Sequence, residues 1–166
     1  MWRAEWGGEI LFAHGSKHWQ PRALWYCQFK PSLNVDILEI TVDKNGRFLV
    51  ANININQDDL CEVNLYAPND QNKQVNFFDK IIDPIRRRST NNTLLGGHFN
   101  CPLTEVDKVG GRDNLHIKRT IQAIQELCNS FDLVDVWRTQ ELEEIKIQCE
   151  REIAITNGNV NKLWNK

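Results

Sequence analysis

The stretch "TLLGGHFNCP" (residues 93–102) is an apolar run that ends in two glycines and leads directly to a histidine and an asparagine. The apolar part predicts a short buried strand. Gly96 and Gly97 lack Cβ atoms, so another backbone or a phosphate group can approach the chain closely there. Asn100 offers both a hydrogen-bond donor and an acceptor. For His98 considered alone, a turn histidine without a function is the more frequent explanation.

A second strand end of this kind is "NLYAPND" (residues 64–70). Pro68 favours an extended conformation at the residue before it, and Asn69 and Asp70 complete a turn. The turn leaves Tyr66 and Asn69 near the rim of the predicted sheet, where loop side chains are free to act. Considered alone, this stretch is more often an ordinary Pro-Asn turn under a core tyrosine.

The segment between residues 35 and 68 has the pattern of three consecutive strands. "VDILEITVDKNGRFLVANININ" (35–56) alternates apolar and polar residues on both sides of Asn45-Gly46. This pattern predicts a β-hairpin closed by a type I′ turn. "LCEVNLYAP" (60–68) alternates in the same way and predicts a third antiparallel strand.

Two segments change to helical spacing. A helix is predicted over 73–88 from the spacing of Phe78, Ile81, Ile82 and Ile85. Pro84 is expected to end or kink this helix one turn early. A second helix, with Asp113 as its N-cap, is predicted from the spacing of Ile117, Ile121, Ile124 and Cys128. "FDLVDVW" (131–137) is then expected to return the chain to the core.

Composition restricts the function classes. The 166 residues carry a net charge of -2, so any contact with nucleic acid must be local. No apolar run approaches the roughly 18 residues of a membrane helix, and the first residues have no signal-peptide pattern. The five cysteines are widely spaced and odd in number, which argues against a disulfide framework and a zinc site. We therefore expect an intracellular protein, nuclear or cytoplasmic, that is neither secreted nor bound to a membrane.

In their order along the chain, these motifs resemble the endonuclease/exonuclease/phosphatase family, the superfamily of DNase I and the apurinic endonucleases. Within that family the resemblance is to the endonuclease domain of non-LTR (LINE-type) retrotransposons, and it covers roughly Glu5 to Arg138. It implies an α/β (α+β) fold: a DNase I-like four-layer sandwich of two mixed sheets flanked by helices, here incomplete. Residues 1–138 are expected to form a partial domain, and 139–166 a divergent charged helix and polar tail.

The resemblance also implies chemistry, because members of this family hydrolyse phosphodiesters with a divalent cation, usually Mg²⁺. Asn100 matches the Asn of the family's GGDFN motif, which contacts the phosphate or the attacking water. His98 stands where the family has the Asp that activates this water. Tyr66 and Asn69 match the Tyr and Asn beside the scissile phosphate. These four residues are the expected catalytic residues.

Three further residues are expected to bind substrate: Asn64 from the same strand motif, and Arg112 and Lys118, which follow "VGG" on the groove side implied by the resemblance. The resemblance implies Mg²⁺, but the family's metal-binding Glu lies upstream of the matched region and its Asp-His pair downstream. We therefore assign no metal ligand to this chain and expect a fragment, truncated at both ends, with absent or very weak activity.

The resemblance implies DNA as the partner, with other retrotransposon polyprotein domains as further candidate partners. Two alternatives to a weak DNA-nicking phosphodiesterase stay open. The first is a noncatalytic module that binds nucleic acid through the same groove, and the second is an inert relic of a decayed element. Whether the chain is an enzyme is therefore undecided from its sequence.

Overall fold

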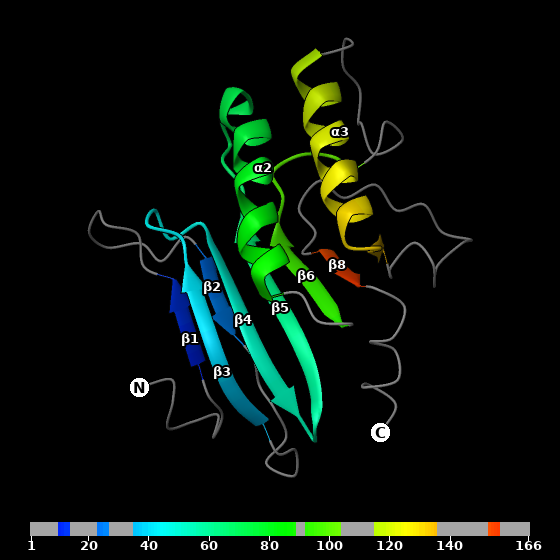
Figure 1. The fold of residues 1–166 in the computed structure, drawn as a ribbon. Helices are drawn as coiled ribbons and strands as arrows, with labels where there is room; N and C mark the ends of the chain where they lie inside the picture. Colours follow the sequence, from blue (N-terminus) through cyan, green and yellow to red (C-terminus); the bar gives the residue numbers. More distant parts are fainter. Residues whose placement is uncertain are drawn as a thin grey trace.

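The computed structural model describes residues 10–13, 23–26, 35–88, 92–103, 115–135 and 153–156. The main element is a mixed sheet whose six strands follow the order β3-β4-β5-β6-β8-β7 (Figure 1). Its strands are β3 (Val35–Val42), β4 (Phe48–Ile55), β5 (Asp58–Tyr66), β6 (Thr93–His98), β7 (Val134–Asp135) and β8 (Ile153–Thr156). β1 (Ile10–Ala13) and β2 (Ala23–Tyr26) form a separate antiparallel pair.

Two helices cover one face of the main sheet, α2 (Gln71–Arg88) and α3 (Leu115–Ser130), and they lie side by side (Figure 1). The alternation of β5 directs Cys61, Val63 and Leu65 into the core beneath them, where each is at most 1% exposed. Burying such apolar side chains supplies most of the favourable free energy of folding. The predicted alternation of this strand and the apolar face of the first helix are both confirmed.

The opposite face of the sheet carries a smaller apolar cluster of Leu49, Ala51, Ile53 and Leu60. β2 contacts β4 and β5, so the two-stranded sheet packs on the face that the helices leave open. The described part of the chain is therefore layered as helices, sheet and second sheet (Figure 1). This mixed α/β sandwich confirms the predicted fold class, and the described residues supply three of its four predicted layers.

The hairpin of β3 and β4 is confirmed, but its predicted type I′ turn is wrong. Only Gly46 has a positive φ, of 65°, whereas a type I′ turn needs positive values at both central residues. The Asp43 carboxylate accepts hydrogen bonds from the backbone N–H groups of Asn45 (3.1 Å) and Arg47 (3.3 Å). These bonds favour a wider loop than two residues would allow.

A two-residue turn with the I′ signature instead joins β4 to β5. Ile55 pairs with Asp58, and the two residues between them, Asn56 and Gln57, have φ values of 51° and 77°. Asn56 adopts the left-handed conformation readily, whereas Gln57 does so at a cost.

The prediction that Pro84 ends or kinks the first helix one turn early is wrong, because α2 continues to Arg88. The last turn is held by two contacts that do not depend on the missing N–H of proline. Ile85 is fully buried in the core, and the guanidinium of Arg88 forms an ion pair with Glu39 on β3. Tertiary packing therefore outweighs the local penalty of proline.

Towards the C-terminal end, the structure places β8 within the segment that was expected to be a charged helix and polar tail. β8 lies between β6 and β7 and is antiparallel to both. The remaining residues of 139–166, the predicted cap Asp113 and the "VGGR" motif lie outside the described residues. Among the described helices, none is long and apolar enough to cross a membrane.

Candidate functional site

The candidate site lies where two parallel strands end side by side. β5 and β6 pair in parallel with Tyr66 opposite His98, so the loops that follow both strands emerge at the same edge of the sheet. α2 begins a few residues after β5, which brings its N-terminal end to this edge as well. In sheets of this kind, ligands bind at the carboxyl ends of the parallel strands.

Gly97 allows the two strands to approach at this point. Its φ of 124° is unfavourable for any residue with a side chain, and a Cβ built there would lie 2.0 Å from the carbonyl oxygen of Leu65. The prediction that a glycine here permits close approach of another backbone is confirmed for Gly97. The approaching group is the backbone of β5.

Tyr66 and His98 are in direct contact. Their rings stack with centroids 5.2 Å apart and an interplanar angle of 27°, and both side chains are half-buried. Tyr66 packs against the apolar cluster on the face of the sheet opposite α2. Asn64 is half-buried two residues earlier on β5, so by the alternation of a strand it shares this face. The structure thus brings three of the predicted site residues together.

Asn100 joins the two loops. Its backbone is left-handed, with a φ of 54°, and its side-chain Nδ2 donates a hydrogen bond to the carbonyl oxygen of Ala67. The N–H of Ala67 donates in turn to the carbonyl oxygen of His98 over 2.8 Å. Part of the hydrogen-bonding capacity of Asn100 therefore fixes the loop, and its Oδ1 has no bonding partner among the described residues.

A buried amide that the sequence analysis missed connects the same loops. Gln74 on α2 is 1% exposed, and its Nε2 donates to the carbonyl oxygens of Pro68 and Asn100, both at 2.9 Å. Its Oε1 accepts a hydrogen bond from the Thr120 hydroxyl on α3 over 3.3 Å. The signal for it was a polar residue at position 74, in helical register with the apolar Phe78 and Ile81.

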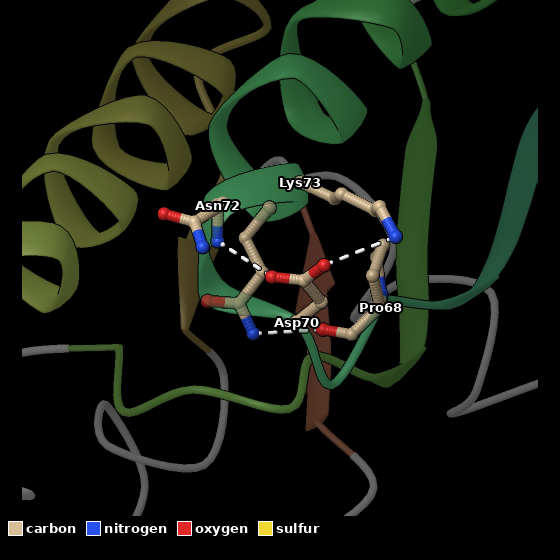
Figure 2. Close-up of polar contacts among 5 residues, drawn as sticks. Pro68, Asp70, Asn72 and Lys73 are labelled. Carbon is tan, nitrogen blue, oxygen red and sulfur yellow. Dashed lines mark hydrogen bonds and ion pairs between the residues drawn. The ribbon is translucent and has the colours of Figure 1, made fainter.

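Asp70 caps α2 and is not available as an isolated ligand. Its carboxylate accepts a hydrogen bond from the N–H of Asn72 over 3.1 Å and lies 3.0 Å from the ammonium of Lys73 (Figure 2). The hydrogen bond from Lys73, followed by that from Asn72, lowers the pKa of the Asp70 carboxyl. The adjoining Asn69 is exposed, as expected for a residue at the rim.

Positive charge reaches this edge of the sheet from a residue that the sequence analysis did not single out. Arg47, in the loop between β3 and β4, donates from Nη1 to the carbonyl oxygen of Tyr66 over 3.3 Å, and its own carbonyl accepts from the N–H of Tyr66. Lys118 is exposed in the first half of α3, three residues after its start. The predicted Arg112 lies outside the described residues.

The donor chemistry of the site suits an anion better than a hard cation. A phenol, an imidazole, amides and a guanidinium can all donate hydrogen bonds to phosphate oxygens. Mg²⁺ is usually held by one or two carboxylates together with substrate oxygens. Among the site residues described above only Asp70 carries a carboxylate, and it already caps α2 and pairs with Lys73. The described residues therefore do not fit the Mg²⁺ site that the family resemblance implies.

Comparisons with known proteins agree with this geometry. No protein-family model matches the chain. The chain is 27% identical over 164 residues to the Transposon TX1 uncharacterized 149 kDa protein of Xenopus laevis, and the match covers 97% of this chain and 12% of that protein. Among solved structures, AP endonuclease LMAP from Leishmania major is similar with a TM-score of 0.56 and 11% identity, covering 70% of this chain and 47% of that one.

The endonuclease domain of TRAS1, a telomere-specific non-LTR retrotransposon, is similar with a TM-score of 0.49 and 14% identity over 82% of this chain and 59% of that one. The likeness to the AP endonuclease confirms the DNase I-like fold that the resemblance predicted. The transposon relative agrees with the retrotransposon branch of that resemblance. The chain spans 12% of that relative and less than half of the AP endonuclease.

Proposed function

We propose that this chain is part of a DNA-nicking phosphodiesterase domain of transposon origin, in which the loops after β5 and β6 hold the scissile phosphate and hydrolysis is absent or very weak. The observation that carries the proposal is the pairing of the two motif-bearing strand ends, with Tyr66 stacked on His98 on a DNase I-like fold. The transposon relative supports DNA as the substrate and a larger polyprotein as the context.

Binding of a phosphodiester follows from the groups at this edge. The hydroxyl of Tyr66 and the amides of Asn69 and Asn100 are neutral donors that can stabilise negative charge on a phosphate oxygen. Arg47 adds a permanent positive charge beside the same strand end. Asn64, Lys118 and the undescribed Arg112 are proposed to contact neighbouring phosphates, which would add affinity without sequence preference.

Weak hydrolysis follows from His98. A neutral imidazole can accept a proton from water, but it lacks the negative charge of the aspartate that the family has at this position. Losing a positioned general base commonly lowers a rate by about 10² to 10⁴. Since the described residues do not fit a Mg²⁺ site, no step of the reaction is assigned to a metal ion.

A noncatalytic nucleic-acid-binding module is the second candidate, and a site built mainly from neutral amide, phenol and imidazole groups and a guanidinium favours it. Nicking of supercoiled plasmid in Mg²⁺ or EDTA, together with binding of a labelled DNA duplex, separates the two. We expect binding that weakens with salt and that Asn100→Ala reduces, with little or no nicking. Nicking that His98→Asp increases would identify a weakened enzyme, and binding without nicking in either protein would identify the binding module.

Vigorous nicking by the native chain, abolished by EDTA, would show that hydrolysis is intact and would contradict the proposal on that point. A folded chain that neither nicks nor binds DNA would contradict it entirely and support an inert relic.

A further inference from the structure

We infer that Gln74 is the positioning residue of this site: its single buried amide sets the spacing between the loop that carries Asn69 and the loop that carries Asn100. The role of Gln74 in positioning phosphate-binding residues rests on the proposed function. The mechanical part of the inference, that one side chain holds both loops, rests on the hydrogen bonds alone.

The geometry of the amide makes it a two-sided clamp. Both hydrogen atoms of Nε2 are used, one for each loop, and both acceptors lie 2.9 Å from the same nitrogen. One acceptor is the carbonyl of Pro68, whose peptide group leads into Asn69; Figure 2 shows the bond to this carbonyl. The other acceptor is the carbonyl of Asn100 itself. The distance between the two candidate phosphate ligands is therefore set by one planar group.

The orientation of the amide is set by its two carbonyl acceptors, and its Oε1 is contacted from α3. The Thr120 hydroxyl is fully buried, lies 3.3 Å from Oε1 of Gln74 and also 3.0 Å from the carbonyl oxygen of His116. A flipped amide would place Oε1 against two carbonyl oxygens and leave these acceptors unsatisfied in the interior. The two carbonyls therefore select the orientation of the amide, and the contact of its Oε1 with Thr120 links α3 through Gln74 to both loops.

If Gln74 only stabilised the core, its loss would change amide hydrogen exchange in a different pattern. Losing a buried polar contact that only stabilises the core raises the opening rate of the whole domain. Losing a clamp raises local opening of the two loops first. The hydrogen bond from the N–H of Ala67 to the carbonyl of His98 crosses between the loops and reports their separation.

The test is amide hydrogen exchange on the full chain, with the Ala67 N–H as the local probe and Val50, in the middle of β4, as the global probe. Gln74→Met is expected to speed exchange at Ala67 at least tenfold and to leave Val50 within twofold of the original chain. Gln74→Glu places a buried carboxylate against two carbonyl oxygens and is expected to speed exchange at both probes near neutral pH. It should recover in part at acidic pH, where a protonated carboxyl can again donate one hydrogen. Gln125→Glu, at an exposed position of α3, is the matched control and should change neither probe.

Thr120→Val provides a milder variant in case the Gln74 variants do not fold. It should raise exchange at Ala67 less than Gln74→Met does, and Thr120→Ser, which keeps the hydroxyl, should restore the original rate. In Gln74→Met, equal acceleration at Ala67 and Val50, or no change at Ala67, would overturn the inference. Binding of a labelled DNA duplex is measured on the same proteins: loss of binding in step with Ala67 exchange supports the site role.

If the exchange pattern is as expected but the original chain binds no DNA duplex, the inference that Gln74 holds both loops stands and the proposed function is contradicted.

Discussion

The imidazole ring of His98 lies against the phenol ring of Tyr66, 5.2 Å from centroid to centroid. The contact follows from the register of the sheet, because the two residues are direct partners at the ends of parallel strands. The position at which the resemblance expects a water-activating carboxylate is thus packed against a position that it expects beside the scissile phosphate. A change at either residue is expected to affect the other.

This coupling can be measured as an interaction energy. In a double-mutant cycle of Tyr66→Leu and His98→Leu, we expect a coupling of about 0.5 to 1.5 kcal/mol in the free energy of unfolding, the range for stacked aromatic pairs. Urea denaturation measures it, and Tyr66→Phe, which keeps the ring and removes the hydroxyl, serves as the control. Strictly additive effects would mean that the rings touch without stabilising the site.

Gly97→Ala is expected to be severely destabilising. The new Cβ would lie 2.0 Å from the carbonyl oxygen of Leu65, and backbone atoms of β5 cannot move away without breaking the parallel pairing with β6. We expect a loss of about 4 kcal/mol or more, or failure to fold. Gly46→Asn is the comparison, because its φ of 65° is one that asparagine tolerates. A Gly97→Ala protein of normal stability would contradict the close approach of the strands.

The described strands and helices were predictable to the extent that they have an unbroken apolar period. The alternation of β5 and the helical spacing of Phe78 and Ile81 correspond to one buried face each, which is why these elements are where the sequence indicated. The site positions Tyr66 and His98 were predictable because each lies at the end of a predicted strand, whereas the parallel pairing that brings the two strand ends together was not predicted.

Features that depend on a single distant contact were not predictable. The turn after β3 depends on the Asp43 carboxylate, and the last turn of α2 depends on an ion pair between Arg88 and Glu39 from separate elements. In the sequence, Gln74 is a polar residue within the apolar face of a helix. The carbonyls of Pro68 and Asn100 that it bonds become its neighbours only in the folded chain. Local patterns do not contain these partners.

Gln57→Gly is expected to stabilise the protein. Gln57 has a φ of 77° in the turn between β4 and β5, where glycine removes the steric cost of a left-handed conformation and completes the preferred Asn-Gly sequence. We expect a gain of about 0.5 to 1 kcal/mol in urea denaturation. Asn45→Gly should have the opposite sign, because Asn45 has no positive φ and glycine only adds freedom to the unfolded chain. A gain at Asn45 would contradict the assignment of the turns.

Stability is expected to fall in alkaline solution because of the buried thiol of Cys61 and the partly buried thiols of Cys101 and Cys128. Burial raises the pKa values of Cys61 and Cys101 from 9.0 to about 12, and burial followed by the charge of Asp135 raises that of Cys128 to about 11. Above pH 9 the unfolded chain loses these protons while the folded chain keeps them, so the free energy of unfolding decreases as pH rises towards the folded values.

Urea midpoints measured at increasing pH test this, with Cys101→Ala expected to have a shallower decline. At pH 8 the same thiols should react slowly with iodoacetamide in the native protein and fast in urea. Fast native alkylation of all three would contradict their burial.

The salt dependence of DNA binding should identify the cations at the site. Each phosphate contact by a basic side chain contributes roughly one unit to the slope of log binding constant against log salt concentration. Arg47→Gln and Lys118→Gln are each expected to lower the slope by about 1 and to weaken binding to all duplex sequences alike. Lys80→Gln, an exposed charge in the second half of α2 away from the strand ends, should leave the slope unchanged. Fluorescence anisotropy over a salt series measures the slope for all three variants. A slope that changes with Lys80→Gln and not with Arg47→Gln would place the DNA on the outer surface of the helices instead of at the ends of β5 and β6.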